Sequence, residues 1–123
     1  MSTKWYVAAG LAAALIPTTG RAGVKEDANL KFCAILGASV EYIVILYSKG
    51  YSLEDAKSEL ISTAKGTEYG PVVIPRMLRE ASSWYEVLSD IDPEQKIKSD
   101  PSLARYLSKR TGQKAYQSCL EAG

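Results

Sequence analysis

Two cysteines and three glutamates are the side chains whose types and spacing could carry chemistry in this chain. Cys33 and Cys119 lie near opposite ends of the sequence, and no histidine accompanies them. Without histidine the chain lacks Ser-His-Asp and Cys-His nucleophile systems, and it also lacks histidine zinc sites. The cysteine spacing differs from that of a C-x-x-C redox pair. The two thiols are therefore better explained as one disulfide than as nucleophiles or metal ligands.

Glu41, Glu80 and Glu86 are the candidates for a pair of catalytic carboxylates of the glycosidase kind. Glu80 and Glu86 fall on one expected helix at a spacing that does not place them on a shared face. Glu41 borders the apolar stripe of another helix, where Arg76 or Arg79 could pair with it. These positions favour ion pairs on a helix surface. The sequence therefore predicts a protein that is not an enzyme, with no cofactor and no metal site.

The first 22 residues have the pattern of a secretory signal peptide. Lys4 precedes the apolar run Trp5–Ile16, and Gly20-Arg21-Ala22 supplies small residues at the minus-three and minus-one positions of a cleavage site. The apolar run is shorter than the roughly 20 residues that span a bilayer. We expect cleavage after Ala22 and a single helical domain over residues 23–123, located in the periplasm or secreted. An uncleaved anchor or a buried first helix are the alternatives, and only a retained segment would reach a membrane.

Charge and compartment narrow the class of protein further. Removal of residues 1–22 takes away Lys4 and Arg21, which lowers the basic count from 15 to 13 against 14 acidic residues. This balance argues against a nucleic-acid-binding protein, which should carry an overall basic field. In an oxidising compartment two cysteines form an internal disulfide by default. Two buried free thiols or an intermolecular bridge are the alternatives to that disulfide.

Turn and cap residues divide the chain after residue 22 into helices. From about Lys25 to Lys49 apolar residues recur at three- and four-residue steps, and Gly50 stands where a C-cap glycine would. Ser52 is the expected N-cap of a second helix that ends before Gly66. The buried face of this second helix is expected to comprise Leu53, Ala56, Leu60, Ile61 and Ala64.

Prolines mark the expected starts of the remaining helices. A third helix is expected to begin at Pro75, with residues 72–74 as coil or a turn of helix leading into it. Asp92-Pro93 and Asp100-Pro101 each have the pattern of an N-cap aspartate with proline at the first helical position. They predict a short helix from 93 to about 98 and a last helix from 101. Thr111-Gly112 is a point where this last helix could kink or divide.

These elements predict an all-α fold, a compact bundle of four to five helices with one disulfide that joins the first and last helices. A chain of this length has room for one core. The broad apolar face of the first helix could be covered by its neighbours or could leave a seam for a homo-oligomer. The apolar stripe of the third helix is expected to comprise Ile74, Met77, Leu78, Ala81, Trp84 or Tyr85, Leu88 and Ile91.

Basic residues on the last helix form the first candidate surface for a partner. No acidic residue lies between Asp100 and Glu121. Cations one turn apart on a helix form neighbouring rows, which could meet an acidic protein or an anionic polymer. A solvated charged face is the plainer interpretation of the same pattern. The candidate residues are Arg105, Lys109, Arg110 and Lys114.

Aromatic residues form the second candidate surface. The chain has eight tyrosines and two tryptophans against a single phenylalanine. A ring with a polar tip suits a surface that becomes buried on binding, although it suits a small core with partial solvent contact almost as well. The candidates, which cluster near helix ends or junctions, are Tyr47, Tyr51, Tyr69, Trp84 and Tyr85.

The layout of the chain resembles that of small exported bacterial helical proteins. The shared features are the signal-like start, Cys33 in the first helix, the run Tyr47–Ala56 that turns into the second helix, and Tyr116–Leu120 at the end. Proteins with this layout include acid chaperones of the HdeA type and immunity proteins that neutralise type VI secretion effectors. The resemblance implies a binding protein that acts as a periplasmic inhibitor or immunity protein and blocks a partner enzyme, such as an exported hydrolase or toxin.

Two other functions are compatible with the same layout. A stress chaperone of the HdeA type would need acid to release apolar surface, and without histidine its switch would consist of carboxylates that titrate at about pH 4. A structural subunit would keep its N-terminal helix as an anchor to a membrane or a larger assembly.

Overall fold

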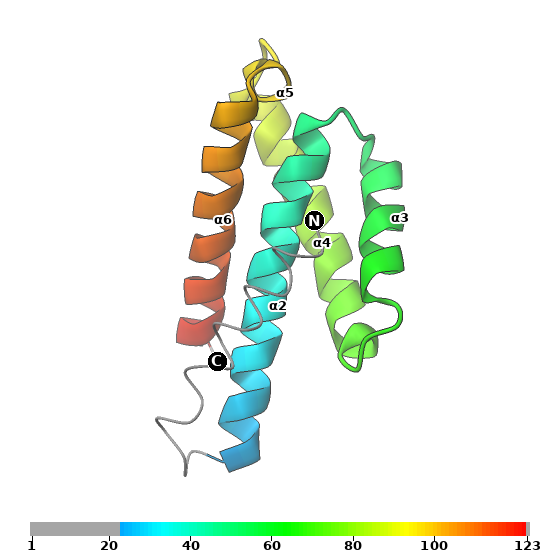
Figure 1. The fold of residues 1–123 in the computed structure, drawn as a ribbon, viewed down its shortest axis with the longest axis vertical. Helices are drawn as coiled ribbons and strands as arrows, with labels where there is room; N and C mark the ends of the chain where they lie inside the picture. Colours follow the sequence, from blue (N-terminus) through cyan, green and yellow to red (C-terminus); the bar gives the residue numbers. More distant parts are fainter. Residues whose placement is uncertain (1–22, 123) are drawn as a thin grey trace.

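The computed structural model describes the backbone of residues 23–122 and side chains from Ala28 onward. Its helices, shown in Figure 1, are α2 (Gly23–Ser48), α3 (Leu53–Ala64), α4 (Gly70–Ile91), α5 (Lys96–Ser99) and α6 (Pro101–Ala122). No strand occurs within this range. The helix α2 runs through the middle, with α6 along one side and α4 on another, and α3 packs mainly on α4. The predicted all-α bundle is confirmed, whereas the predicted signal peptide falls outside the described residues.

The central helix α2 supplies most of the core. A helix that is apolar on nearly all sides must be surrounded by other elements. By length and composition Ala28–Ser48 is apolar enough to cross a membrane, but 61% of its most apolar window is buried inside the protein. A core helix meets the same criteria, and the packing of the bundle accounts for the hydropathy. The side chains that α2 buries include Cys33, Leu36, Val40, Ile43, Val44, Leu46 and Tyr47.

The end of α2 and the start of α3 follow the cap residues. Gly50 adopts a φ of 87°, its N–H donates to the Tyr47 carbonyl at 3.0 Å, and the N–H of Tyr51 donates to the Leu46 carbonyl at 3.1 Å. This pair of bonds is a Schellman motif, in which glycine takes the left-handed position. Ser52 then caps α3, because its Oγ accepts the N–H of Asp55 at 3.1 Å. Both cap predictions are confirmed.

The helix α4 begins at Gly70, and the predicted start at Pro75 was wrong. Pro71 occupies the first turn, where a missing N–H loses no helical hydrogen bond. The N–H of Val73 donates to the carbonyl of Tyr69 at 2.9 Å, so the helix is already established before Pro75. Pro75 removes one backbone bond inside the helix. Burial of Val73 and Met77 in the core between α2, α3 and α4 offsets that loss.

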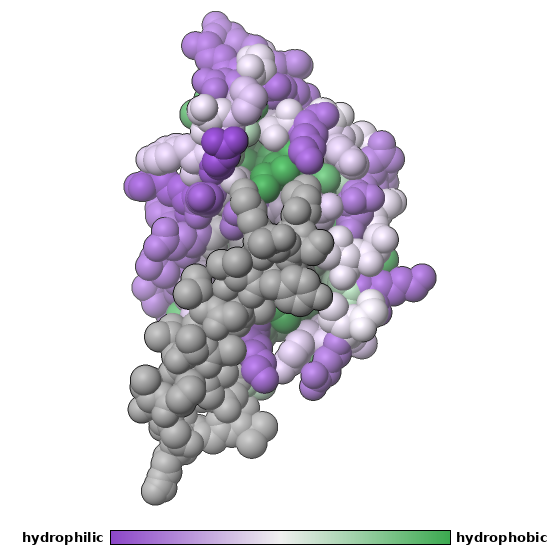
Figure 2. Space-filling model, viewed as in Figure 1, coloured by the Kyte–Doolittle hydropathy of each residue, from purple (hydrophilic) through white to green (hydrophobic). Residues whose placement is uncertain are grey.

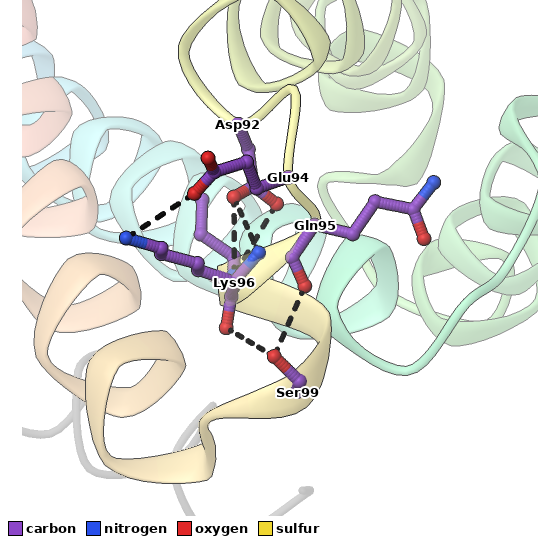
Figure 3. Close-up of polar contacts among 6 residues, drawn as sticks. Asp92, Glu94, Gln95, Lys96 and Ser99 are labelled. Atoms are coloured by element: carbon purple, nitrogen blue, oxygen red, sulfur yellow. Dashed lines mark hydrogen bonds and ion pairs between the residues drawn. The ribbon is translucent and has the colours of Figure 1, made fainter.

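The short helix α5 begins at Lys96, not directly after Asp92 as predicted. Gln95 adopts a left-handed conformation with a φ of 57°. A helix therefore cannot run continuously from Pro93 into Lys96. The buried Asp92 still caps α5 from a distance, because its Oδ1 accepts the N–H of Lys96 at 2.7 Å and that of Ile97 at 3.2 Å (Figure 3). The aspartate therefore keeps the predicted capping role at a different spacing.

The last helix begins as predicted and continues without a break. Asp100 caps it, since its Oδ1 accepts the N–H of Ser102 at 3.0 Å and that of Leu103 at 3.2 Å. α6 is one helix over Pro101–Ala122, so it is not divided at Thr111-Gly112. Gly112 has a packing role instead of a backbone-breaking one.

Gly112 and Gly37 bring the backbones of α6 and α2 into direct contact. A Cβ atom built on Gly112 would lie 2.8 Å from the carbonyl oxygen of Gly37, and one built on Gly37 would lie 2.9 Å from the carbonyl oxygen of Gly112. Only glycine allows such an approach. Ala104 and Ser108 are buried on the same side of α6 at four-residue steps, so small residues line this contact.

A disulfide joins Cys33 of α2 to Cys119 of α6, with the two Cα atoms 5.5 Å apart. The predicted bond between the first and last helices of the domain is therefore confirmed. Disulfides persist in oxidising compartments, so this bond is compatible with export of the protein.

Two predicted core residues lie on the surface. In α3 the buried side chains are Ala56, Leu60 and Ala64, while Ile61 is 37% exposed because it lies one position off this narrow stripe. In α4 the final residue, Ile91, is 62% exposed, since the chain turns away there toward α5. The helical period therefore predicted the residues at the centre of each buried face correctly, but it wrongly included Ile61 and Ile91.

Candidate functional site

Near the C-terminal end of α2, the ring of Tyr47 packs in the core and stabilises the fold. Tyr47, one of the predicted partner-binding residues, is only 4% exposed, so little of its ring is available to a partner. Its ring meets the edge of the Tyr85 ring at a centroid distance of 5.5 Å, and Lys98 Nζ lies 4.8 Å from its centroid. Its hydroxyl donates to Oδ2 of Asp92 at 3.4 Å. Tyr47 thus joins α2, α4 and the α5 region in the core.

The other tyrosine candidates are more accessible, and Tyr51 and Tyr85 lie together while Tyr69 lies apart from them. Tyr85 is half-buried and donates its hydroxyl to the carbonyl of Tyr51 at 2.9 Å, while Tyr51 is exposed. Tyr69 precedes α4 and packs against the core at the opposite end of that helix. These rings therefore do not form one aromatic patch with Trp84, which lies midway along α4.

Alkaline pH should destabilise the fold through Tyr85. Burial, and next the nearby Tyr47, raises the pKa of the Tyr85 hydroxyl from its ordinary value of 10.0 to about 12. The folded state therefore holds this proton more tightly, so the stability it contributes is present below pH 10 and is lost as pH rises toward 12. We expect the melting temperature to fall over that range in the wild-type protein and to fall less in Tyr85→Phe. An equal fall in both proteins would contradict this assignment.

The four basic candidates lie on the exposed side of α6, and the structure adds a tyrosine to them. Figure 2 shows strongly hydrophilic side chains along the edge of the molecule where α6 lies. Within residues 28–122 none of the four cations forms an ion pair. Tyr106 is 59% exposed and stands one turn before Arg110. We name this surface the basic face of α6: Arg105, Tyr106, Lys109, Arg110 and Lys114.

Tyr106 was not among the candidates that the sequence suggested. In the sequence it counts as one of the apolar residues of the last helix, together with Leu103 and Leu107. The available signal was its spacing, since Lys109 and Arg110 follow it by three and four residues and hence share its side of the helix. Charged neighbours at both helical spacings indicate an exposed ring.

A groove of about 620 Å³ lies between α4 and α6, with α2 as its floor. The helices α4 and α6 both pack on α2, which leaves part of the α2 surface open between them. Two of the predicted candidates, Trp84 and Lys114, line this groove from opposite walls. The residues that line the groove include Phe32 and Leu36 from α2, Arg76, Glu80 and Trp84 from α4, and Lys114 and Ser118 from α6.

Hydrogen bonds along α4 fix the wall of this groove. Arg76 Nε lies 3.2 Å from Oε2 of Glu80, and Trp84 Nε1 donates to Oε1 of the same carboxylate at 3.2 Å. Both Glu80 oxygens are therefore engaged, and the Trp84 ring is held in one orientation. This arrangement orients an aromatic wall and a cation rather than providing a free catalytic carboxylate.

The described residues hold no group of three or more histidine, cysteine, aspartate or glutamate side chains that could bind a metal ion. Glu86, the other carboxylate candidate on α4, is exposed on the surface. No protein-family model, curated protein or solved structure matches this chain. Two surfaces are therefore the candidates for binding a partner, the basic face of α6 and the groove between α4 and α6.

Proposed function

We propose that this chain is a non-catalytic protein that binds an acidic surface of a partner protein through the basic face of α6. The observation that carries the proposal is Tyr106, an exposed ring at helical spacing from cations that have no ion-pair partner among residues 28–122. Tyrosine and arginine are enriched among the residues that dominate binding energy at protein interfaces. Like charges one turn apart on a helix repel each other, and an acidic partner would relieve that repulsion.

The partner that fits best is an exported enzyme whose active site the chain blocks, as a periplasmic inhibitor or immunity protein would. The disulfide is compatible with export, and the helical layout resembles that of immunity proteins. Enzymes that use a pair of carboxylates, such as glycosidases, have a negatively charged cleft. A basic helix with an exposed tyrosine is complementary to such a cleft in charge.

Charge reversal on α6 tests this function. We expect the triple variant Arg105→Glu, Lys109→Glu and Arg110→Glu to weaken inhibition of the exported hydrolase encoded by the adjacent reading frame by about 100-fold. That loss corresponds to about 2.7 kcal/mol of binding free energy. The measurement is the inhibition constant of each purified variant against that hydrolase, at one fixed salt concentration because surface charges are screened.

A matched variant separates local recognition from overall charge. Lys31, Lys49 and Lys65 are exposed on α2 and near α3, and changing all three to glutamate alters the net charge by the same amount. This control should change the inhibition constant by less than about 5-fold, because screened charges beyond a Debye length contribute little. Equal losses in the two triple variants would contradict recognition by α6. A hydrolase that the wild-type protein does not inhibit would contradict the proposed enzyme partner.

A chaperone switched by acid is the second candidate function, and one residue supports it. Asp92 is the only buried carboxylate among residues 28–122, and it caps α5 and accepts a bond from Tyr47. These bonds tie α2 and the start of α5 to one carboxylate at the end of the bundle. The basic face of α6 has no role in that function, so we favour the inhibitor.

A further inference from the structure

We propose that the groove between α4 and α6 receives an amphipathic, acidic helix of the partner protein. This inference rests on the proposed function, because it takes a protein partner as given and assigns the segment that enters. A bound helix would contact α2, α4 and α6 together, since all three line the groove. The groove has a volume of about 620 Å³. Helix recognition in a groove of this kind is a recurring mode of protein binding.

The apolar part of the groove can accept one face of a helix. Phe32 and Leu36 lie one turn apart on the α2 floor, with Phe32 only partly buried. Trp84 forms one wall, and its bond to Glu80 holds the ring in place before any partner arrives. Preorganised aromatic anchors of this kind reduce the entropy lost on binding. Leucines or other apolar residues at i, i+3 or i+4, and i+7 of the partner helix match this surface.

The charges on the two walls select an acidic helix. Arg76 on α4 and Lys114 on α6 line opposite walls of the groove. Arg76 uses its Nε on Glu80, and a guanidinium has four further N–H donors for a carboxylate. Both oxygens of Glu80, the one acidic group among these lining residues, are engaged by Arg76 and Trp84. Carboxylates on the flanks of a partner helix would therefore face cations on both sides.

Lys114 belongs to the groove and to the basic face of α6. The two surfaces are therefore continuous around α6, from Lys114 through Arg110 to Tyr106. A single acidic partner can cover both, with a helix in the groove and an acidic surface against the outer side of α6. The positive charge of both surfaces favours such a partner over a second copy of this chain, whose own basic face would be repelled.

Synthetic peptides test the groove without the natural partner. The probe is a labelled amphipathic helix of about 18 residues, long enough for about five turns, with leucines on one face and glutamates on its flanks. Binding to the full-length protein is measured by fluorescence anisotropy. We expect this peptide to bind at least 10-fold more tightly than one with lysines in place of the glutamates. We also expect it to bind at least 10-fold more tightly than one with serines in place of the leucines.

Two tryptophan variants locate the binding site. Ser118 is exposed and lines the groove, so Ser118→Trp should fill it and weaken peptide binding at least 10-fold. Gln117 is its exposed neighbour outside the groove lining, so Gln117→Trp should leave binding within 2-fold of wild type. Since both changes fall on exposed positions of α6, loss of folding would not explain a difference between them.

The possible outcomes separate this inference from the proposed function. Equal binding of the glutamate and lysine peptides, or no effect of Ser118→Trp, would overturn the acidic-helix assignment. Hydrolase inhibition that survives Ser118→Trp would overturn it as well, while leaving inhibition through the basic face of α6 intact. A dimer in sedimentation experiments that Ser118→Trp dissociates would assign the groove to a second copy of the chain and would also overturn it. Inhibition and peptide binding that both fall with Ser118→Trp, but not with Gln117→Trp, would support it.

Discussion

Loss of the Cys33–Cys119 disulfide should lower the free energy of unfolding by about 4 to 5 kcal/mol. The bond closes a sequence separation of 86 residues, and in the chain-entropy model it removes conformational entropy worth this much from the unfolded state, which the unfolded chain regains when the bond is lost. Domains are typically stable by only about 5 to 15 kcal/mol. Without the bond the bundle should therefore retain little stability, and its melting temperature should fall steeply.

Urea unfolding of the wild-type protein and of the double variant Cys33→Ala, Cys119→Ala measures this effect. Alanine is preferred because Cys33 is fully buried and a serine hydroxyl there would need a hydrogen-bond partner. A reducing agent should destabilise the wild-type protein by a similar amount and should leave the double variant unchanged. A difference below about 1 kcal/mol between the two proteins would refute the entropic role of the disulfide.

Replacement of Gly112 with alanine should lower the free energy of unfolding by about 1 to 3 kcal/mol. On an isolated helix the same change would be stabilising by about 1 kcal/mol, because alanine is the better helix former. In α6 the added Cβ would lie 2.8 Å from the carbonyl oxygen of Gly37 and 3.0 Å from the Cβ of Glu41. These atoms belong to the backbone of α2 or are fixed to it, so they cannot rotate away. The two helices would have to separate, and the loss of packing exceeds the gain in helix propensity.

Gly66 provides the matched control for this prediction. It lies in the turn after α3, a Cβ added there meets no atom within 4 Å, and its φ is not in the left-handed region. Gly66→Ala should therefore leave stability unchanged or raise it by up to about 1 kcal/mol through the unfolded state. Thermal and urea unfolding of the two single variants gives the comparison. A Gly112→Ala protein as stable as wild type would show that α2 and α6 do not require contact between their backbones.

Much of the fold could be predicted because its boundaries depend on local chemistry. Gly50, Ser52 and Asp100 act within one turn of the chain, through a left-handed glycine and side-chain oxygens that accept backbone N–H groups. The disulfide could be predicted because only two cysteines are present. Neither inference requires knowledge of distant neighbours.

The errors in the fold prediction have tertiary causes. Pro75 has the local pattern of a helix start, but burial of Val73 and Met77 against α2 and α3 extends α4 through it. Gly112 has the local pattern of a helix break, whereas its contact with Gly37 shows that a small residue is needed for packing. In each case the local pattern predicts a helix boundary, whereas packing against residues distant in the sequence keeps the helix continuous.

The candidate site was predicted less completely than the fold. The basic residues of α6 lie on the surface as a charged helical face should, and Trp84 and Lys114 line one groove. The sequence left core and surface open for the tyrosines, and the structure buries Tyr47 against Tyr85 while it exposes Tyr106. A tyrosine suits both core and surface, so only its neighbours in space decide between them.

The packing of α2 against α6 also sets the order in which this protein can fold as it is made. The central helix leaves the ribosome well before Pro101–Ala122, and most of its contacts are with that last helix. Domains form as their segments emerge, N-terminal parts first, so the side of α2 that packs on α6 stays uncovered until α6 has been made. Cys33 likewise has no native partner until Cys119 has emerged. The bundle can therefore close only after α6 has emerged, and a nascent chain that stops before α6 would present one uncovered side of α2 to chaperones and proteases.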